Sequence, residues 1–188
     1  MTDIVKEPEK QPVFSRSLLA IFRDWLLLAV VGAVIGLDQL TKYLVDANMR
    51  LGQSIPAEGF FRLTYTTNSG TIFGLFPGQT LPLTILSVGA IAFLIYFYRT
   101  HPSPTLLMRA AIGVLLGGAL GNLIDRLRHG AVIDFVDVGP WPIFNIADSA
   151  ITIGIALIVI IAILTPETKK PGQNDADGPP RASGDGRG

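Results

Sequence analysis

The stretch GNLIDRLRHGAVIDFVDVGPWPIFNIADS, from Gly121 to Ser149, decides how the rest of the chain is interpreted. It lies between two long apolar runs. It carries four acids, Asp125, Asp134, Asp137 and Asp148, and two asparagines, Asn122 and Asn145. Ionisable groups at the edge of a hydrocarbon layer are costly, so their presence there indicates a function. We therefore interpret the remaining chain as a scaffold for this polar stretch.

Composition indicates a multi-pass membrane protein. Of the 188 residues, only 16% are charged and the mean hydropathy is +0.46, whereas a soluble domain carries about 25% charged residues. The charges also avoid long stretches of the chain. The formal net charge is +0, so no basic surface indicates nucleic acid as a partner. The length predicts one domain, and we expect a monomer.

The chain has no cysteine, which excludes disulfides, a thiol nucleophile and thiolate metal sites. The only histidines, His101 and His129, are far apart and not in a ligand spacing, so we predict interfacial side chains and no metal site. We also expect no cofactor. No cleavable signal peptide is evident, because the first apolar run begins near Trp25 and leads into charged residues.

Four apolar runs predict an all-α membrane protein with four transmembrane helices. A bilayer core requires about 20 predominantly apolar residues. The predicted helices cover about residues 21–45, 81–98, 105–127 and 144–164, within a membrane domain of residues 21–165. Residues 1–20 are predicted to form a tail, and the Gly/Pro/Asp-rich residues 166–188 a disordered tail.

A small extramembrane β element is predicted within the turn-rich residues 46–80. Within it, Phe61, Leu63 and Tyr65 alternate with Arg62 and Thr64, which is a strand pattern of period two. The turn at residues 68–70 follows this pattern.

The third predicted helix has a nearly flat face, because Gly113, Gly117 and Gly121 recur every four residues. Such a face lets another helix approach closely.

The lysines and arginines predict that both termini are cytoplasmic. With the N-terminus inside, ten lie in inside segments: Lys6, Lys10, Arg16, Arg23, Arg99, Arg109, Lys169, Lys170, Arg181 and Arg187. Five lie in outside segments: Lys42, Arg50, Arg62, Arg126 and Arg128. In this topology the first and third helices end outside and the fourth begins outside, so the polar residues of these three ends lie near one depth.

Asp134 and Asp148 are the candidate acid/base pair of an amide hydrolase. One carboxylate can take a proton from water while the other donates a proton to the carbonyl oxygen. Two close carboxylates share a proton, because they do not both ionise easily. Asp125 is the competing member. The structural alternatives are a loop acid for Asp134 and an acid favoured by the helix dipole for Asp148.

The other polar residues have local explanations. Asp125 is next to Arg126 and one turn from Asn122, which indicates a hydrogen-bonded ion network. Asp38 and Lys42 are four residues apart and form a pair at a helix end. Asn145 shares a helix face with Asp148 and is predicted to orient it. Asp137 is predicted to be a solvated loop acid.

Two rival functions fit the sequence less well. A Ser/Lys hydrolase would use Lys42 to activate Ser69 or Ser149, but Asp38 would raise the pKa of Lys42 when this chemistry needs it lowered. A transporter or channel would need polar residues at several depths, whereas the acids gather at one face.

The sequence resembles the bacterial lipoprotein signal peptidase family, signal peptidase II. The resemblance covers about residues 38–153. Its blocks are Asp38-Gln39-Leu40-Thr41-Lys42, Asn68-Ser69-Gly70-Thr71-Ile72-Phe73, Gly121-Asn122-Leu123-Ile124-Asp125-Arg126 with Val132-Ile133-Asp134-Phe135, and Phe144-Asn145-Ile146-Ala147-Asp148-Ser149. Thr71 and Ile72 depart from the small residues that usually follow the asparagine-x-glycine in this family.

The resemblance implies an aspartic endopeptidase of the bacterial inner membrane, with its site at the periplasmic face. It implies substrates that are prolipoproteins carrying diacylglycerol on the lipobox cysteine, cleavage just before that cysteine, contact with membrane phospholipid, and inhibition by globomycin. The catalytic pair maps onto Asp134 and Asp148. Supporting residues map onto Asp38, Lys42, Asn68, Gly70, Asn122, Asp125, Arg126 and Asn145. The family's periplasmic β-cradle maps onto residues 46–76. Because the implied substrates carry diacylglycerol, a further hypothesis is that the glycine face of the third predicted helix leaves room for the acyl chains. In that case, replacing Gly117 with leucine would impair turnover of the lipid-bearing substrate.

Overall fold

The computed structural model describes residues 21–70, 80–101 and 104–165. The predictions for both tails, for the end of the β element, and for the loop containing Thr71 and Ile72 lie outside the described residues.

Within the described residues, four helices are long and apolar enough to cross a membrane. They are α2 (Trp25–Asn48), α3 (Thr80–Thr100), α4 (Leu106–His129) and α5 (Ile146–Leu164). The four predicted spans are confirmed, each with ends shifted by a few residues. The chain is therefore a multi-pass membrane protein.

Local capping chemistry sets several of these helix ends. The carboxylate of Asp24 accepts a hydrogen bond from the Leu27 amide at the start of α2, and the Thr105 hydroxyl does the same for Met108 in α4. These side chains satisfy backbone donors that the first turn leaves free. At the other end of α4, Gly130 adopts φ 71°, the left-handed conformation that ends many helices.

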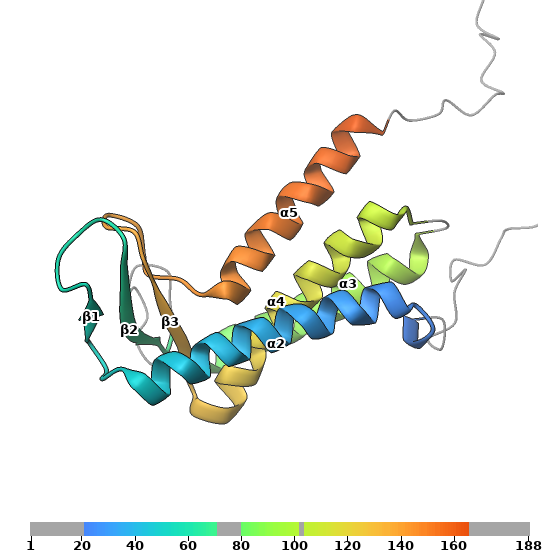
Figure 1. Ribbon diagram of the computed structural model, residues 1–188. Helices are drawn as coiled ribbons and strands as arrows, with labels where there is room; N and C mark the ends of the chain where they lie inside the picture. The colour runs from blue at the N-terminus through green and yellow to red at the C-terminus, as the bar shows by residue number, and fades with distance from the viewer. Residues whose placement is uncertain (1–20, 71–79, 102–103, 166–188) are drawn as a thin grey trace, which may run out of the picture.

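Helix α4 is the centre of the helical bundle. It packs against α2, α3 and α5. Helix α5 diverges from α2 toward its C-terminal end (Figure 1), whereas Ile161 near that end is still buried in a cluster with Met108 and Ala111 of α4. A Cβ atom added at Gly117 would lie 2.6 Å from Cβ of Val34 on α2, and one added at Gly154 would lie 2.5 Å from Cγ of Leu115 on α4. The flat face predicted for α4 is therefore confirmed. The space beside it is filled by α2, so the hypothesis that it accommodates acyl chains is wrong at Gly117.

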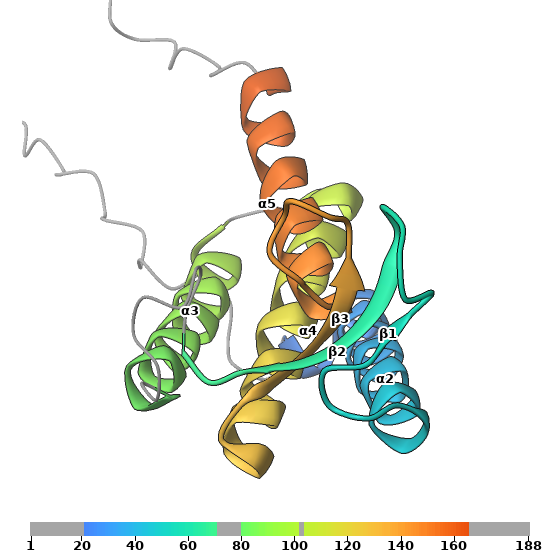
Figure 2. The same cartoon turned by 90° about the vertical axis from the view of Figure 1, so that its left-hand side faces the viewer.

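A three-stranded antiparallel sheet stands at one end of the bundle (Figures 1 and 2). Its strand order is β1 (Ser54–Ile55), β2 (Arg62–Asn68) and β3 (Val132–Asp137). The segment containing Asp134 was predicted to be a loop, and this prediction is wrong, since Asp134 pairs with Thr66 across β3 and β2. The sheet thus combines the predicted β element with a strand from the polar stretch.

An apolar cluster fixes the sheet to the end of α2. Val45 of α2 packs with Tyr65 of β2 and with Ile133 and Phe135 of β3. The Tyr65 hydroxyl donates a hydrogen bond to Asp46 Oδ1 at 2.5 Å. Burial, together with this acidic partner, raises the pKa of Tyr65 to about 12. The tyrosine therefore remains a neutral donor that holds β2 on α2.

The opposite end of the bundle is held by a buried ionic cluster that the sequence analysis did not identify. The Asp24 carboxylate accepts hydrogen bonds from the Tyr98 hydroxyl of α3 and from the Arg109 guanidinium of α4, with Arg109 Nε 2.7 Å from Asp24 Oδ2. Burial alone would raise the pKa of Asp24, but these two partners lower it to about 2. The cluster joins α2, α3 and α4.

Candidate active site

Asp134 and Asp148 come from different elements and are joined through two asparagine amides. Asp134 lies on β3 and Asp148 in the first turn of α5. Asn145 Nδ2 donates to Asp134 Oδ1 at 2.7 Å, and Asn122 Nδ2 donates to Asp148 Oδ1 at 2.7 Å. Asn145 Nδ2 also lies 3.1 Å from Asn122 Oδ1. The two predicted acids thus belong to one hydrogen-bonded cluster.

The start of α5 fixes the Asn145 amide. Asn145 is the N-cap residue, and its Oδ1 accepts from the Asp148 amide nitrogen at 2.9 Å. Asp148 Oδ2 in turn accepts from the Asn145 nitrogen at 3.4 Å, which completes a capping box. Because the Asn145 oxygen faces the helix, its NH₂ group is left to face Asp134. Asp148 is therefore both an acid in the first turn of α5, as the structural alternative has it, and a member of the hydrogen-bonded cluster.

Lys42 fixes the Asn122 amide in the same way. Its ammonium lies 3.0 Å from Asn122 Oδ1, 2.9 Å from Asp38 Oδ2 and 2.8 Å from Asp125 Oδ2. A lysine ammonium has three donors and no acceptor, so the Asn122 oxygen must face Lys42. The Asn122 NH₂ group then faces Asp148. The predicted Asp38–Lys42 pair is confirmed.

The carboxylates around Lys42 have further donors. Asp38 Oδ1 accepts from the Ala147 amide at 2.9 Å, and Asp125 Oδ2 accepts from the Ile133 amide at 3.2 Å. Gln39 Nε2 lies 2.9 Å from Asp125 Oδ1 and 3.2 Å from Asp38 Oδ2. These contacts connect the end of α2 to β3 and to the first turn of α5. Asp125 does belong to an ion network, but the prediction of Arg126 as its cation is wrong, because the ammonium beside Asp125 is that of Lys42 and Arg126 contacts Ser87 and the Asn122 carbonyl oxygen instead.

The remaining predicted support residues surround the cluster. Arg126 Nη1 contacts Ser87 Oγ of α3 at 3.3 Å and the Asn122 carbonyl oxygen at 3.4 Å. The Gly70 amide donates to Asn68 Oδ1 at 3.2 Å, so the turn after β2 is closed locally. The Asn68 side chain also makes a hydrogen bond with Asp134.

The pKa of Asp134 is raised to about 7. Burial is the largest cause, since only 2% of the residue is exposed, and the neighbouring Asp148 carboxylate is the second. Hydrogen bonds from Asn145 and Asn68 and the charge of Lys42 act in the opposite direction. Asp134 therefore retains a proton near neutral pH, as an acid catalyst requires.

Asp137 is not a solvated loop acid, so this prediction is wrong. It ends β3 and is buried, with Arg62 Nη2 2.8 Å from its Oδ2. The Thr64 hydroxyl donates to the same oxygen at 2.8 Å, and the Gly139 amide donates to Oδ1 at 3.1 Å. These contacts, led by the one from Thr64, lower the pKa of Asp137. Two of its partners, Arg62 and Thr64, lie on β2, so Asp137 joins β2 to β3.

Within the described residues, no group of three or more histidine, aspartate or glutamate side chains could hold a metal ion. The two carboxylates joined by the asparagine amides can perform proton transfer with water.

Comparison with known proteins identifies similar chains. The family model for Signal peptidase (SPase) II matches residues 30–164. The lipoprotein signal peptidase of Halothermothrix orenii is 44% identical over 137 residues, which covers 72% of this chain and 93% of that protein. The lipoprotein signal peptidase of Moorella thermoacetica is 43% identical over 135 residues, which covers 71% and 89%.

Two solved structures of bacterial membrane enzymes, obtained by the in meso method, have similar folds. The structure at 2.3 Å resolution has a TM-score of 0.70 and 35% sequence identity, and the match covers 79% of this chain and 93% of that one. The structure at 1.9 Å resolution has a TM-score of 0.67 and 37% identity, with 74% and 92% covered.

Proposed function

This chain belongs to the signal peptidase II family of proteases, and we propose that it removes signal peptides from prolipoproteins whose lipobox cysteine carries diacylglycerol. The bond cleaved is the peptide bond just before that cysteine. The observation that carries this proposal is the cluster in which Asn122 and Asn145 present N–H groups to Asp148 and Asp134.

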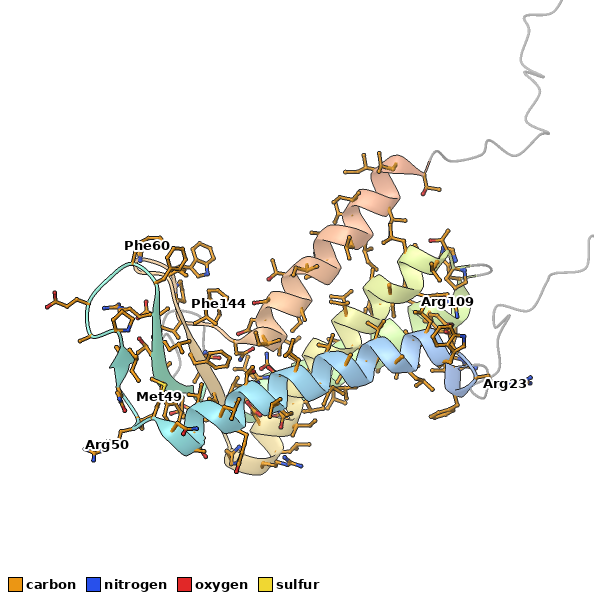
Figure 3. All side chains as sticks on the ribbon, in the orientation of Figure 1. Arg23, Met49, Arg50, Phe60, Arg109 and Phe144 are labelled. Carbon is orange, nitrogen blue, oxygen red and sulfur yellow. The ribbon has the colours of Figure 1, made fainter. Side chains whose placement is uncertain are left out.

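The proposed location is the bacterial inner membrane, with both termini in the cytoplasm and the sheet in the periplasm. The positive-inside rule supports this orientation. Arg23 and Arg109 lie at the end of the bundle opposite Met49 and the sheet (Figure 3). The active site would then lie at the periplasmic interface. A lipid-anchored substrate reaches such a site by diffusing in the membrane plane, and water reaches it from outside.

In the proposed mechanism, Asp148 is the general base and Asp134 the general acid. Asp148 takes a proton from water as the water oxygen bonds to the scissile carbonyl carbon. Asp134 gives its proton to the carbonyl oxygen, which yields a neutral tetrahedral diol. When the diol collapses, the proton held by Asp148 goes to the leaving nitrogen and a diol hydroxyl returns its proton to Asp134. The peptide bond then breaks and both carboxyl groups regain their initial states.

The hydrogen bonds favour particular oxygens for these transfers. Oδ1 of Asp134 and Oδ1 of Asp148 each accept a 2.7 Å hydrogen bond from an asparagine NH₂ group. An oxygen that accepts such a bond is a poor site for the shared proton. Oδ2 of each residue is therefore the oxygen proposed to exchange protons with water and substrate, since the one bond from the Asn145 backbone nitrogen to Asp148 Oδ2 is longer, at 3.4 Å. Lys42 supports this arrangement because it fixes the orientation of the Asn122 amide.

The remaining partners are also proposals. Phospholipid would surround α2 to α5, and burial of the diacylglyceryl chains would add affinity, at about 0.8 kcal/mol per buried methylene. Globomycin-type cyclic peptides would compete with the substrate for this site.

The test is cleavage of a diacylglyceryl-modified prolipoprotein by purified protein, with the same precursor lacking the lipid as the matched control. We expect a product that begins at the lipidated cysteine, much slower cleavage of the control, and inhibition by globomycin. Equal cleavage of the two precursors would refute the proposed substrate class. Absence of cleavage by the folded protein in a membrane environment would refute the activity.

A further inference from the structure

Three aromatic side chains are exposed on the loops at the outer end of the sheet. Phe60 and Phe61, between β1 and β2, are 59% and 73% exposed, and Trp141, between β3 and α5, is 67% exposed. All three lie outside the four membrane-spanning helices. Large apolar groups gathered on a surface indicate an interaction site. We call Phe60, Phe61 and Trp141 the aromatic tip.

The loops of the aromatic tip are held in place. The Phe60 and Phe61 rings pack edge to face, with centroids 4.8 Å apart. Phe60 lies against the loop of Trp141, because a Cβ atom added at Gly139 would be 3.3 Å from Phe60 Cδ2. Gly139 also has φ 76°, and its amide donates to Asp137 Oδ1 at 3.1 Å. Two chain segments distant in sequence are thus packed together while their aromatic rings remain exposed.

The position of the aromatic tip indicates what covers it. The two loops extend from the sheet toward the flank on which α5 lies (Figure 1), and Phe60 lies on that side (Figure 3). Exposed Ile55 of β1 pairs with exposed Leu63 of β2 beside it. Exposed apolar side chains therefore extend from the aromatic tip onto β1 and β2. Aromatic rings are enriched where a protein surface meets lipid headgroups.

We propose that the aromatic tip inserts into the headgroup region of the bilayer beside α5 and anchors the sheet to the membrane surface. Because β3 belongs to this sheet, the anchor also holds Asp134 at a constant depth relative to the lipid. The occupant of this surface is the bilayer itself. The inference is independent of the proposed catalytic mechanism.

Tryptophan fluorescence in vesicles tests the anchor, because the chain has only two tryptophans. Replacement of Trp25 (Trp25→Phe) leaves Trp141 as the single reporter in the full chain. The protein is reconstituted into phosphatidylcholine vesicles whose acyl chains carry bromine either near the headgroup or near the chain end. The matched control is Trp141→Phe, which leaves only Trp25 at the opposite end of α2. Circular dichroism of each reconstituted variant checks that the helices are intact.

We expect bromine near the headgroup to quench Trp141 at least about twofold more than bromine near the chain end, as expected for an interfacial ring. Iodide in the aqueous phase should quench Trp141 weakly. Strong iodide quenching with no bromine quenching would overturn the proposal. So would shielding from iodide that appears only at a high protein-to-lipid ratio, because a second copy of the chain would then be the partner. Shielding that appears only when a prolipoprotein is added would assign the surface to substrate.

Discussion

Close packing of α4 against α2 gives a quantitative prediction for Gly117→Ala. The added methyl carbon would lie 2.6 Å from Val34 Cβ, 2.9 Å from Val34 Cγ1 and 3.1 Å from the Val31 carbonyl oxygen. Non-bonded carbon atoms pack at about 3.5–4.0 Å, so the two helices must separate by about 1 Å or Val34 must move. Overpacking of this kind costs about 1–3 kcal/mol.

The matched control is Gly36→Ala, the same substitution within α2. A Cβ atom at Gly36 has nothing within 4 Å, so the methyl group meets no obstacle. Glycine is about 1 kcal/mol less favourable than alanine inside a helix, and Gly36→Ala should therefore be neutral or stabilising. The same substitution should thus lower the free energy of unfolding at Gly117 and leave it unchanged or raise it at Gly36.

The assay is reversible unfolding in mixed micelles, followed by circular dichroism as the fraction of denaturing detergent rises. Val34→Ala removes the obstructing atoms, so the double variant Val34→Ala/Gly117→Ala should lose less stability than the two single losses combined. If Gly117→Ala is as stable as Gly36→Ala, α4 and α2 are not in the close contact described above, and the predicted overpacking is refuted.

Four further predictions concern charge and hydrogen bonding. Lys42→Met leaves the Asp38 and Asp125 carboxylates buried without a cation, so the free energy of unfolding should fall by about 3–5 kcal/mol in the same assay, and a loss below about 1 kcal/mol would contradict the network. Because the pKa of Asp134 is about 7, the rate of cleavage should fall as the pH rises through 7 and the acid is lost; a profile flat from pH 5 to 9 would argue against this role. The raised pKa of Asp134 also makes stability depend on pH. Its contribution to the free energy of unfolding is fully present below the ordinary pKa of 3.8 and is lost as the pH rises through about 7. Asp134→Asn should therefore reduce the pH dependence of stability measured by thermal unfolding. Tyr65→Phe removes one hydrogen bond and should cost about 0.5–1.5 kcal/mol, with unchanged stability as the contradicting result.

The helices and much of the site could be predicted because their signals are local. Runs of apolar residues define the four spans, and the i, i+4 spacing pairs Asp38 with Lys42. The topology then places the ends of three helices at one depth. Asn122 and Asn145 do connect there with Asp134 and Asp148.

The features that the sequence did not predict depend on contacts between distant residues. Strand β3 was missed because its partner β2 is far away in the chain, as in the pairing of Arg62 with Asp137. A six-residue strand that is buried on both faces also lacks a clear polar alternation. The partner of Asp24 could not be identified for the same reason, since Arg109 belongs to another helix. Residue spacing identifies neighbours on one helix and carries no information on which helices pack together.

The most direct test of the central claim is the rate at which a diacylglyceryl-modified prolipoprotein is cleaved by the parent protein, by Asp134→Asn and by Asp148→Asn. Each replacement preserves the shape of the side chain and removes its acid/base function. We expect the parent to cleave the substrate and both variants, folded by circular dichroism, to lose nearly all activity. Cleavage by either folded variant at a rate near that of the parent would contradict the dyad and would make Asp125 the next candidate.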